Sequence, residues 1–139
     1  MRDVPNFLSE LESYLTPFAW KQFNVVLLPG IMTQEVSGME NPYLTIVQSP
    51  HPNMILHELS HSWFGNQVTC DSWPSYWINE AFAVFLERKM TQKLFGKDEL
   101  EKEQKDGLNL LQGDLQKLGG TSFAALEPTI DAGTNPEKA

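Results

Sequence analysis

Two histidines and a glutamate lie together in the segment His57-Glu58-Leu59-Ser60-His61, an H-E-x-x-H motif. Residues four apart lie on one face of an α-helix, so both imidazole rings would project side by side and could bind one zinc ion. Glu58 lies about 100° around the helix from His57, where its carboxylate could take a proton from a water on the metal without ligating the metal itself. The spacing therefore predicts a zinc site with Glu58 as the general base.

A third zinc ligand has to come from elsewhere, because catalytic zinc usually has three protein ligands and one open position. Glu80 follows His61 after 18 intervening residues, in the otherwise apolar segment 77–86. An unpaired carboxylate on a buried helix costs roughly several kcal/mol in desolvation, so a metal ion or a strong donor should face it. We therefore expect one zinc ion per chain, bound by His57, His61 and Glu80.

Less specific interpretations of these side chains stay open. Two histidines at helical spacing are also compatible with a surface pair or with hydrogen-bonded core residues, and Glu80 is what favours the metal. We assign no role to His51, and we expect Cys70 to be a small core or loop residue. The four tryptophans are predicted to be core aromatics rather than a ligand cage: Trp20, Trp63, Trp73 and Trp77.

Apolar periodicity predicts the elements that position these residues. Helices are expected over residues 4–16, 52–64, 74–95 and 98–118, with Asp98 capping the last one together with Glu101. Short strands are expected over 23–28 and 43–47, and Gly38-Met39-Glu40-Asn41 should lie on a loop or an edge strand beside them. This predicts a single α/β domain over 1–139, mainly helical, with a small piece of sheet packed on the H-E-x-x-H helix and an irregular tail over 121–139.

Composition limits the partners and the compartment. The chain carries 10 Lys and Arg against 18 Asp and Glu, a net charge of -8, which disfavours nucleic acid as a partner. Its N-terminus lacks the layout of a signal peptide, and no stretch approaches the ~20 apolar residues of a membrane span. A single cysteine fits a reducing environment. We therefore expect a cytoplasmic protein with no membrane partner.

The H-E-x-x-H motif, the spacing to Glu80 and the upstream Gly38-Met39-Glu40-Asn41 together resemble the gluzincin aminopeptidases, which include aminopeptidase N, aminopeptidase B and leukotriene A4 hydrolase. The flanking segments are most similar to the aminopeptidase B and leukotriene A4 hydrolase branch: His61-Ser-Trp-Phe-Gly-Asn-Gln-Val-Thr69, Trp77-Ile-Asn-Glu80 and Phe85-Leu-Glu-Arg-Lys89. The resemblance covers about residues 10–139 but only the central part of the family's thermolysin-like catalytic domain. It implies a partial domain of this kind and a zinc-dependent hydrolase that removes N-terminal residues from peptides.

The resemblance also implies roles for individual residues. Zinc would be bound by His57, His61 and Glu80, and Glu58 would activate the water. Glu40 would anchor the free α-amine of the substrate, because a fixed carboxylate near the metal pairs with a protonated N-terminus and measures off one residue. The backbone at Gly38 and Met39, together with Asn41, would position the peptide.

One feature of the family has no counterpart in this sequence. In relatives a tyrosine past the zinc glutamate, in a motif like V-P-Y-E-K-G, donates a hydrogen bond to the oxyanion, whereas Tyr14, Tyr43 and Tyr76 all precede Glu80. The alternative is therefore a truncated, catalytically weak or inactive relative that binds zinc and acts as a structural or interaction module. Such a chain would associate or oligomerise through an uncovered apolar face formed by Leu108, Leu111, Leu115 and Leu118.

Overall fold

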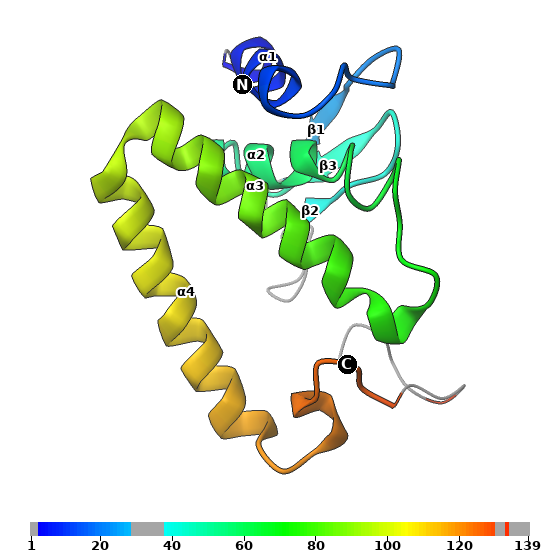
Figure 1. The fold of residues 1–139 in the computed structure, drawn as a ribbon, viewed down its shortest axis with the longest axis vertical. Coiled ribbons are helices and arrows are strands. Elements are labelled where there is room, and N and C mark those ends of the chain that lie inside the picture. Colours follow the sequence, from blue (N-terminus) through cyan, green and yellow to red (C-terminus); the bar gives the residue numbers. More distant parts are fainter. Residues whose placement is uncertain (1–2, 29–37, 130–132, 134–139) are drawn as a thin grey trace.

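The computed structural model describes residues 3–28, 38–129 and 133. Its elements, seen in Figure 1, are α1 (Val4–Tyr14), β1 (Val25–Leu27), β2 (Gly38–Met39), β3 (Thr45–Val47), α2 (Pro52–Ser60), the 3-10 helix η1 (Trp73–Ser75), α3 (Trp77–Phe95), α4 (Lys97–Leu118) and the 3-10 helix η2 (Ser122–Ala124). Helices dominate and the sheet is small, as predicted. The boundary of the irregular tail stays a prediction, because residues 130–132 and 134–139 lie outside the described part.

The sheet brings the segment that carries Glu40 next to the H-E-x-x-H helix. Its strand order is β1-β3-β2, with β1 parallel and β2 antiparallel to β3. Gly38 pairs with Val47 and Met39 with Ile46, so this part of the predicted 38–41 segment forms the edge strand. Both β2 and β3 contact α2, which confirms that the sheet packs on that helix.

α2 is the centre of the fold, and its residues explain why. Its sequence is apolar on most of its surface, and it packs against α1, α3 and the sheet. Pro52 starts the helix, where a missing N–H costs nothing and the fixed φ favours the first turn. The core around it draws on three helices and one turn: Phe7, Leu11, Ile55, Leu56, Leu59, Trp63, Leu86 and Met90.

The end of α2 differs from the prediction of a helix over 52–64. The α-helix ends at Ser60, residues 61–63 continue as turns, and Phe64 forms an isolated β-bridge with Val68. Gly65 follows with φ +125°, a conformation that glycine adopts without strain, and its N–H donates to the carbonyl of Val68. The early end matters for the site, because it turns the carbonyl of Phe64 back towards the ring of His61.

α3 begins at Trp77 rather than Pro74, because residues 73–75 form η1. Residues 77–86 of the helix are mainly apolar, whereas its second half carries charged and polar side chains, and only one face is covered by the described residues. That face carries Asn79, Ala83, Leu86 and Met90, spaced four, three and four apart.

The prediction of core tryptophans is wrong at two positions. Trp63 is buried, but Trp73 is 61% exposed and Trp77 also lies at the surface. Trp20 is half-buried and donates its indole N–H to the carbonyl of Ser62. The uncovered face of α3 also leaves the Glu80 side chain 40% exposed, so burial of the whole helix is not what demands a partner for it.

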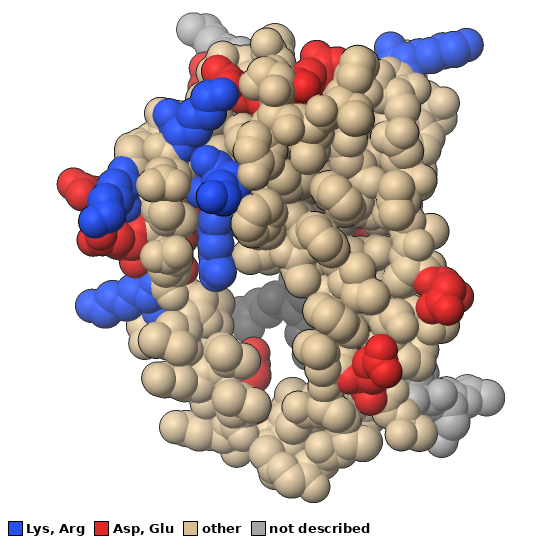
Figure 2. All heavy atoms as spheres, in the orientation of Figure 1, with Lys and Arg blue, Asp and Glu red and all other residues tan. Residues whose placement is uncertain are grey.

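α4 starts at Lys97, directly after Gly96, which bends the chain with φ +96°. The predicted capping box is wrong: Asp98 lies inside the first turn and makes no side-chain cap, although its charge there favours the helix dipole. α3 and α4 diverge from this bend, as Figure 1 shows. Figure 2 shows an opening between them, with Lys and Arg side chains gathered over their upper parts.

α4 carries several exposed leucines among mostly charged and polar residues. Leu108 is 54% exposed, and Leu110, Leu111 and Leu115 are exposed to a similar or greater extent, while Leu118 is half-buried. A hollow of about 420 Å³ separates α3 from α4 and is lined in part by Phe85, Arg88 and Lys89. None of the helices in the described residues combines the length and apolar character that a membrane crossing requires.

Candidate metal centre

The two motif histidines meet as their spacing predicts. His57 and His61 lie one turn apart on α2 and its C-cap, with their ring centroids 4.8 Å apart and their planes at 81°. Their Nε2 atoms are 3.1 Å apart. His61 is buried and His57 half-buried, so both rings are held by the surrounding structure.

The second nitrogen of each ring determines which atom carries the proton. Nδ1 of His57 lies 3.1 Å from Oε2 of Glu87, and Nδ1 of His61 lies 2.9 Å from the carbonyl oxygen of Phe64. Both partners are acceptors, so each Nδ1 must be the N–H donor. In the neutral rings the Nε2 lone pairs then point at one another, which is the state required of metal ligands.

Glu80 completes a triangle of three side chains that could hold a metal ion. From the first turn of α3, its Oε2 lies 3.2 Å from Nε2 of His57, and its Oε1 lies 3.5 Å from Nε2 of His61. Zinc–nitrogen bonds of about 2.0–2.1 Å in a tetrahedral arrangement place two ligands about 3.3–3.4 Å apart. The three separations scatter around that value, so the residues fit a zinc ion.

The electrostatics of the triangle favour positive charge between its side chains. Burial alone would lower the pKa of His57, but its hydrogen bonds to the carboxylates of Glu80 and Glu87, together with their charges, raise it to about 10. Glu80 raises the pKa of His61 in the same way, against the effect of burial. The pKa of Glu80 falls well below its usual range, because its bonds to His57 and His61 outweigh its own desolvation. Without a metal, protons therefore have to stand between these atoms.

Glu58 lies beside the triangle and contacts the edge strand. Burial raises its pKa to about 7, opposed by the neighbouring His57 and His61. A Cβ atom at Gly38 would overlap Oε1 of Glu58, so the backbone of β2 passes directly against this carboxylate. Glycine at position 38 is therefore what leaves room for Glu58.

Glu40 lies on the other side of Glu58. Single ligand atoms of Glu40, Glu58 and His61 all lie within 4.8 Å of one another. These three residues and the triangle are alternative metal sets rather than two sites, because the remaining nitrogen of His61 is used by the Phe64 carbonyl. Burial and the charges of Glu80 and Glu40 raise the pKa of the nearby Tyr76, so its phenol stays protonated.

The role of the predicted substrate-binding segment stays a prediction. Gly38 and Glu40 lie close to Glu58, and Met39, whose backbone is expected to position the peptide, pairs with Ile46 and has an exposed side chain. Asn41 lies in the turn between β2 and β3, where its carbonyl accepts the N–H of Leu44.

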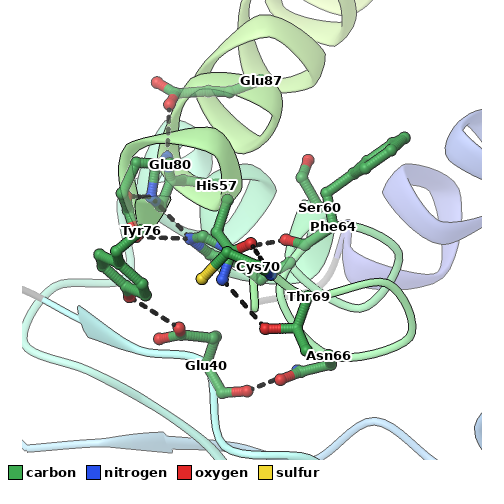
Figure 3. A network of polar contacts seen from close by, with 12 residues as sticks. Glu40, His57, Ser60, Phe64, Asn66, Thr69, Cys70, Tyr76, Glu80 and Glu87 are labelled. Carbon is green, nitrogen blue, oxygen red and sulfur yellow. Dashed lines mark hydrogen bonds and ion pairs between the residues drawn. The ribbon is translucent and has the colours of Figure 1, made fainter. Parts of the chain in front are cut away.

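Three residues at the site were missed from the sequence, and Figure 3 shows how they lie. Glu87 accepts from His57; Tyr76 donates to Oε1 of Glu40 at 3.0 Å; Asn66 donates its side-chain N–H to the main-chain carbonyl of Glu40 at 2.7 Å. Spacing on α3 could have indicated the first two, because Tyr76 precedes Glu80 by one turn and Glu87 follows it by two. Asn66 had no such signal, since it depends on a tertiary contact.

Comparisons with known proteins agree with this geometry. The Peptidase family M1 domain matches residues 2–117. Leucine aminopeptidase 2 of Emericella nidulans is 40% identical over 101 residues, which is 68% of this chain and 16% of that protein. Leukotriene A-4 hydrolase of Xenopus laevis is 32% identical over 127 residues, which is 86% of this chain and 20% of that protein.

Solved structures show the same relationship. Native leukotriene A4 hydrolase from Saccharomyces cerevisiae matches with a TM-score of 0.84 and 27% identity, over 98% of this chain and 23% of that one. The yeast enzyme in complex with bestatin matches with a TM-score of 0.80 and 26% identity, over 99% of this chain and 23% of that one. The chain thus spans less than a quarter of the length of these relatives and corresponds to part of their catalytic domain. It belongs to peptidase family M1.

Proposed function

We propose that this chain is the zinc-binding core of an aminopeptidase, which hydrolyses N-terminal residues from peptides. The observation that carries the proposal is the triangle of side chains formed by His57, His61 and Glu80. The two Nε2 atoms lie 3.1 Å apart, and the two oxygens of Glu80 lie 3.2 Å from one and 3.5 Å from the other. Membership of family M1 and the similarity to leucine aminopeptidases support it.

The proposed chemistry is hydrolysis of the first peptide bond. When bound, zinc supplies a Lewis acid that polarises the scissile carbonyl and lowers the pKa of water. Glu58 accepts the proton of the attacking water and returns it to the leaving amine, a role for which a pKa of about 7 is well matched near neutral pH. Glu87 and the Phe64 carbonyl hold the two imidazoles in the tautomer that leaves Nε2 free.

Glu40 would restrict cleavage to the N-terminal residue. Its carboxylate lies within 4.8 Å of the Glu58 oxygen and the His61 nitrogen, so an ammonium group paired with it stands about one residue from the metal ligands. A charge-assisted hydrogen bond to a protonated amine is stronger than a neutral one and favours a free N-terminus over a blocked one.

The test is hydrolysis of aminoacyl fluorogenic amides by the zinc-loaded chain, compared with the Glu58→Gln variant. Removing a general base costs about a hundredfold to ten-thousandfold, so we expect activity in the wild type and almost none in the variant. Glu127→Gln is the matched control, because Glu127 is exposed. Equal rates in the wild type and Glu58→Gln would refute the aminopeptidase proposal.

A second candidate function follows from the exposed leucines of α4, Leu108, Leu110, Leu111 and Leu115. Leu108, Leu111 and Leu115 are spaced three and four apart and share one face of the helix. An exposed apolar face is typical of an interaction site, so the chain could bind zinc and serve as a structural or interaction module. Zinc binding without Glu58-dependent hydrolysis, together with self-association at micromolar concentration, would favour this candidate.

The domain organisation and the compartment are also proposals. We propose that residues 1–139 form one partial catalytic domain with an irregular tail over 121–139, and limited proteolysis should then cut the tail first. The single cysteine supports a cytoplasmic location, and the net charge of -8 supports peptide rather than nucleic-acid partners.

A further inference from the structure

Tyr76 lies at the junction between η1 and α3, where it is the C-cap of the first and the N-cap of the second. Its ring packs against Trp73, with centroids 5.4 Å apart. The carbonyl of Tyr76 also accepts the N–H of Glu80 at 3.4 Å, which ties this junction to the metal triangle. The phenol is therefore carried by backbone that is fixed from both sides.

The Tyr76 hydroxyl reaches from α3 to the edge strand. It donates a hydrogen bond to Oε1 of Glu40 at 3.0 Å, and Figure 3 shows the two side chains pointing at each other. A phenol has one proton to donate, and at neutral pH it keeps that proton. The hydroxyl thus donates to one carboxylate oxygen of Glu40, and the Glu80 carboxylate lies close to the same hydroxyl.

Glu40 is held at a second point by its main chain. Asn66 donates to the Glu40 carbonyl at 2.7 Å, so the backbone is fixed by the loop after α2 and the carboxylate by α3. With Oε1 occupied, Oε2 is the oxygen left to pair with an incoming ammonium group. A carboxylate fixed in this way loses less conformational entropy when a ligand binds.

We propose that Tyr76 is a positioning residue that orients the Glu40 carboxylate for the free N-terminal amine of the substrate. The proposal rests on the proposed function, because it assumes that Glu40 pairs with that amine. Tyr76 itself needs no contact with the substrate. Its hydrogen bond would set the preference for a free over an acylated N-terminus.

The experiment measures binding rather than turnover. The dissociation constants of leucine hydroxamate and N-acetyl-leucine hydroxamate are determined by calorimetry on the zinc-loaded chain, for the wild type, Tyr76→Phe, Glu40→Gln and the double variant. Tyr14→Phe is the matched control, because Tyr14 is exposed at the end of α1. Zinc affinity and melting temperature are recorded for every variant.

We expect the wild type to prefer the free amine and Tyr76→Phe to lose about tenfold of that preference, which is the worth of one hydrogen bond to a charged group. Zinc affinity should not change. In the Glu40→Gln background, Tyr76→Phe should have no further effect, because the two residues act through one contact.

Other outcomes would overturn the proposal in distinguishable ways. If Tyr76→Phe keeps the preference for the free over the acetylated hydroxamate, the positioning role is refuted and the role of Glu40 is not affected. An equal loss for both hydroxamates means that the hydroxyl contacts a group common to both ligands, and a loss of zinc affinity means that it acts on Glu80. A wild type that binds zinc but shows no preference removes the role of Glu40, whereas one that binds no zinc removes the proposed function as well.

Discussion

Zinc should stabilise the folded chain, and Glu80→Ala should remove most of that gain. The Nε2 atoms of His57 and His61 lie 3.1 Å apart and within 3.2 and 3.5 Å of the Glu80 carboxylate oxygens, so one ion would join α2 and α3, which otherwise hold together by packing. An ion that binds only the folded state stabilises it by about 2.7 kcal/mol at a free concentration of 100 times Kd. With an unfolding entropy of about 2.1 cal/mol/K per residue, that gain raises the Tm of 139 residues by roughly 9 °C.

The Glu80→Ala variant loses one of three ligands. Losing a group that only orients a ligand already weakens metal binding about tenfold to a hundredfold, so losing the ligand should cost at least a hundredfold. At the same free zinc the variant is then half occupied at most, and the gain falls to about 0.4 kcal/mol. The Tm rise should shrink to roughly 1–2 °C.

The assay is thermal unfolding of chelator-stripped protein with and without buffered zinc. The quantity compared is the rise in Tm within each variant, because Glu80 also pairs with protonated His57 when no metal is bound. Glu127→Gln is again the control at an exposed site. An unchanged Tm of the wild type on adding zinc would refute the metal site, and an undiminished rise in Glu80→Ala would refute Glu80 as a ligand.

Four further perturbations test other parts of the site. Gly38→Ala should keep zinc binding but lower turnover about a hundredfold in the fluorogenic assay, because the new Cβ displaces the Glu58 carboxylate; wild-type turnover would contradict this. Glu87→Gln should weaken zinc binding about tenfold to a hundredfold in a chelator competition, since it removes the charge behind His57, and unchanged affinity would count against that role. Zinc binding at pH 8 should release about one proton, because the pKa of His57 is raised to about 10 without metal. Calorimetry in buffers of different ionisation enthalpy measures the number of protons released, and a value of zero would contradict the prediction. Burial and the charge of Glu87 raise the pKa of Glu103 from 4.5 to about 7, so its contribution to stability is complete below pH 4.5 and is lost as the pH rises through 7. In urea unfolding, Glu103→Gln should therefore lose less stability between pH 5 and pH 8 than the wild type, and equal losses of stability would refute the assignment.

Local spacing was enough to predict that His57 and His61 lie side by side, because a four-residue interval specifies one face of any α-helix. The apolar run around Glu80 pointed to the residue that joins them, although its side chain is 40% exposed and the helix is not fully buried. The helix over 4–16 and the two strands were also predicted to within a few residues, because their apolar patterns are short-range properties. The predictions were wrong where packing determines the structure: at the early end of α2, at the start of α4, and in the exposure of Trp73 and Trp77.

By itself, the amino-acid sequence indicated His57, His61 and Glu80 as a candidate ligand set, the helix that carries the two histidines and the family that the chain resembles. A periodic pattern along one helix specifies a common face without reference to the rest of the fold. Only the tertiary structure decided how the rings are oriented and how the carboxylates are shared. Glu87 holds one histidine, Tyr76 and Asn66 hold Glu40, and the bare backbone of Gly38 leaves space for Glu58. Apart from the local relation of Glu87 and Tyr76 to Glu80, these contacts join elements distant in sequence. Their distances depend on how α2, α3 and the sheet pack, which no local pattern encodes.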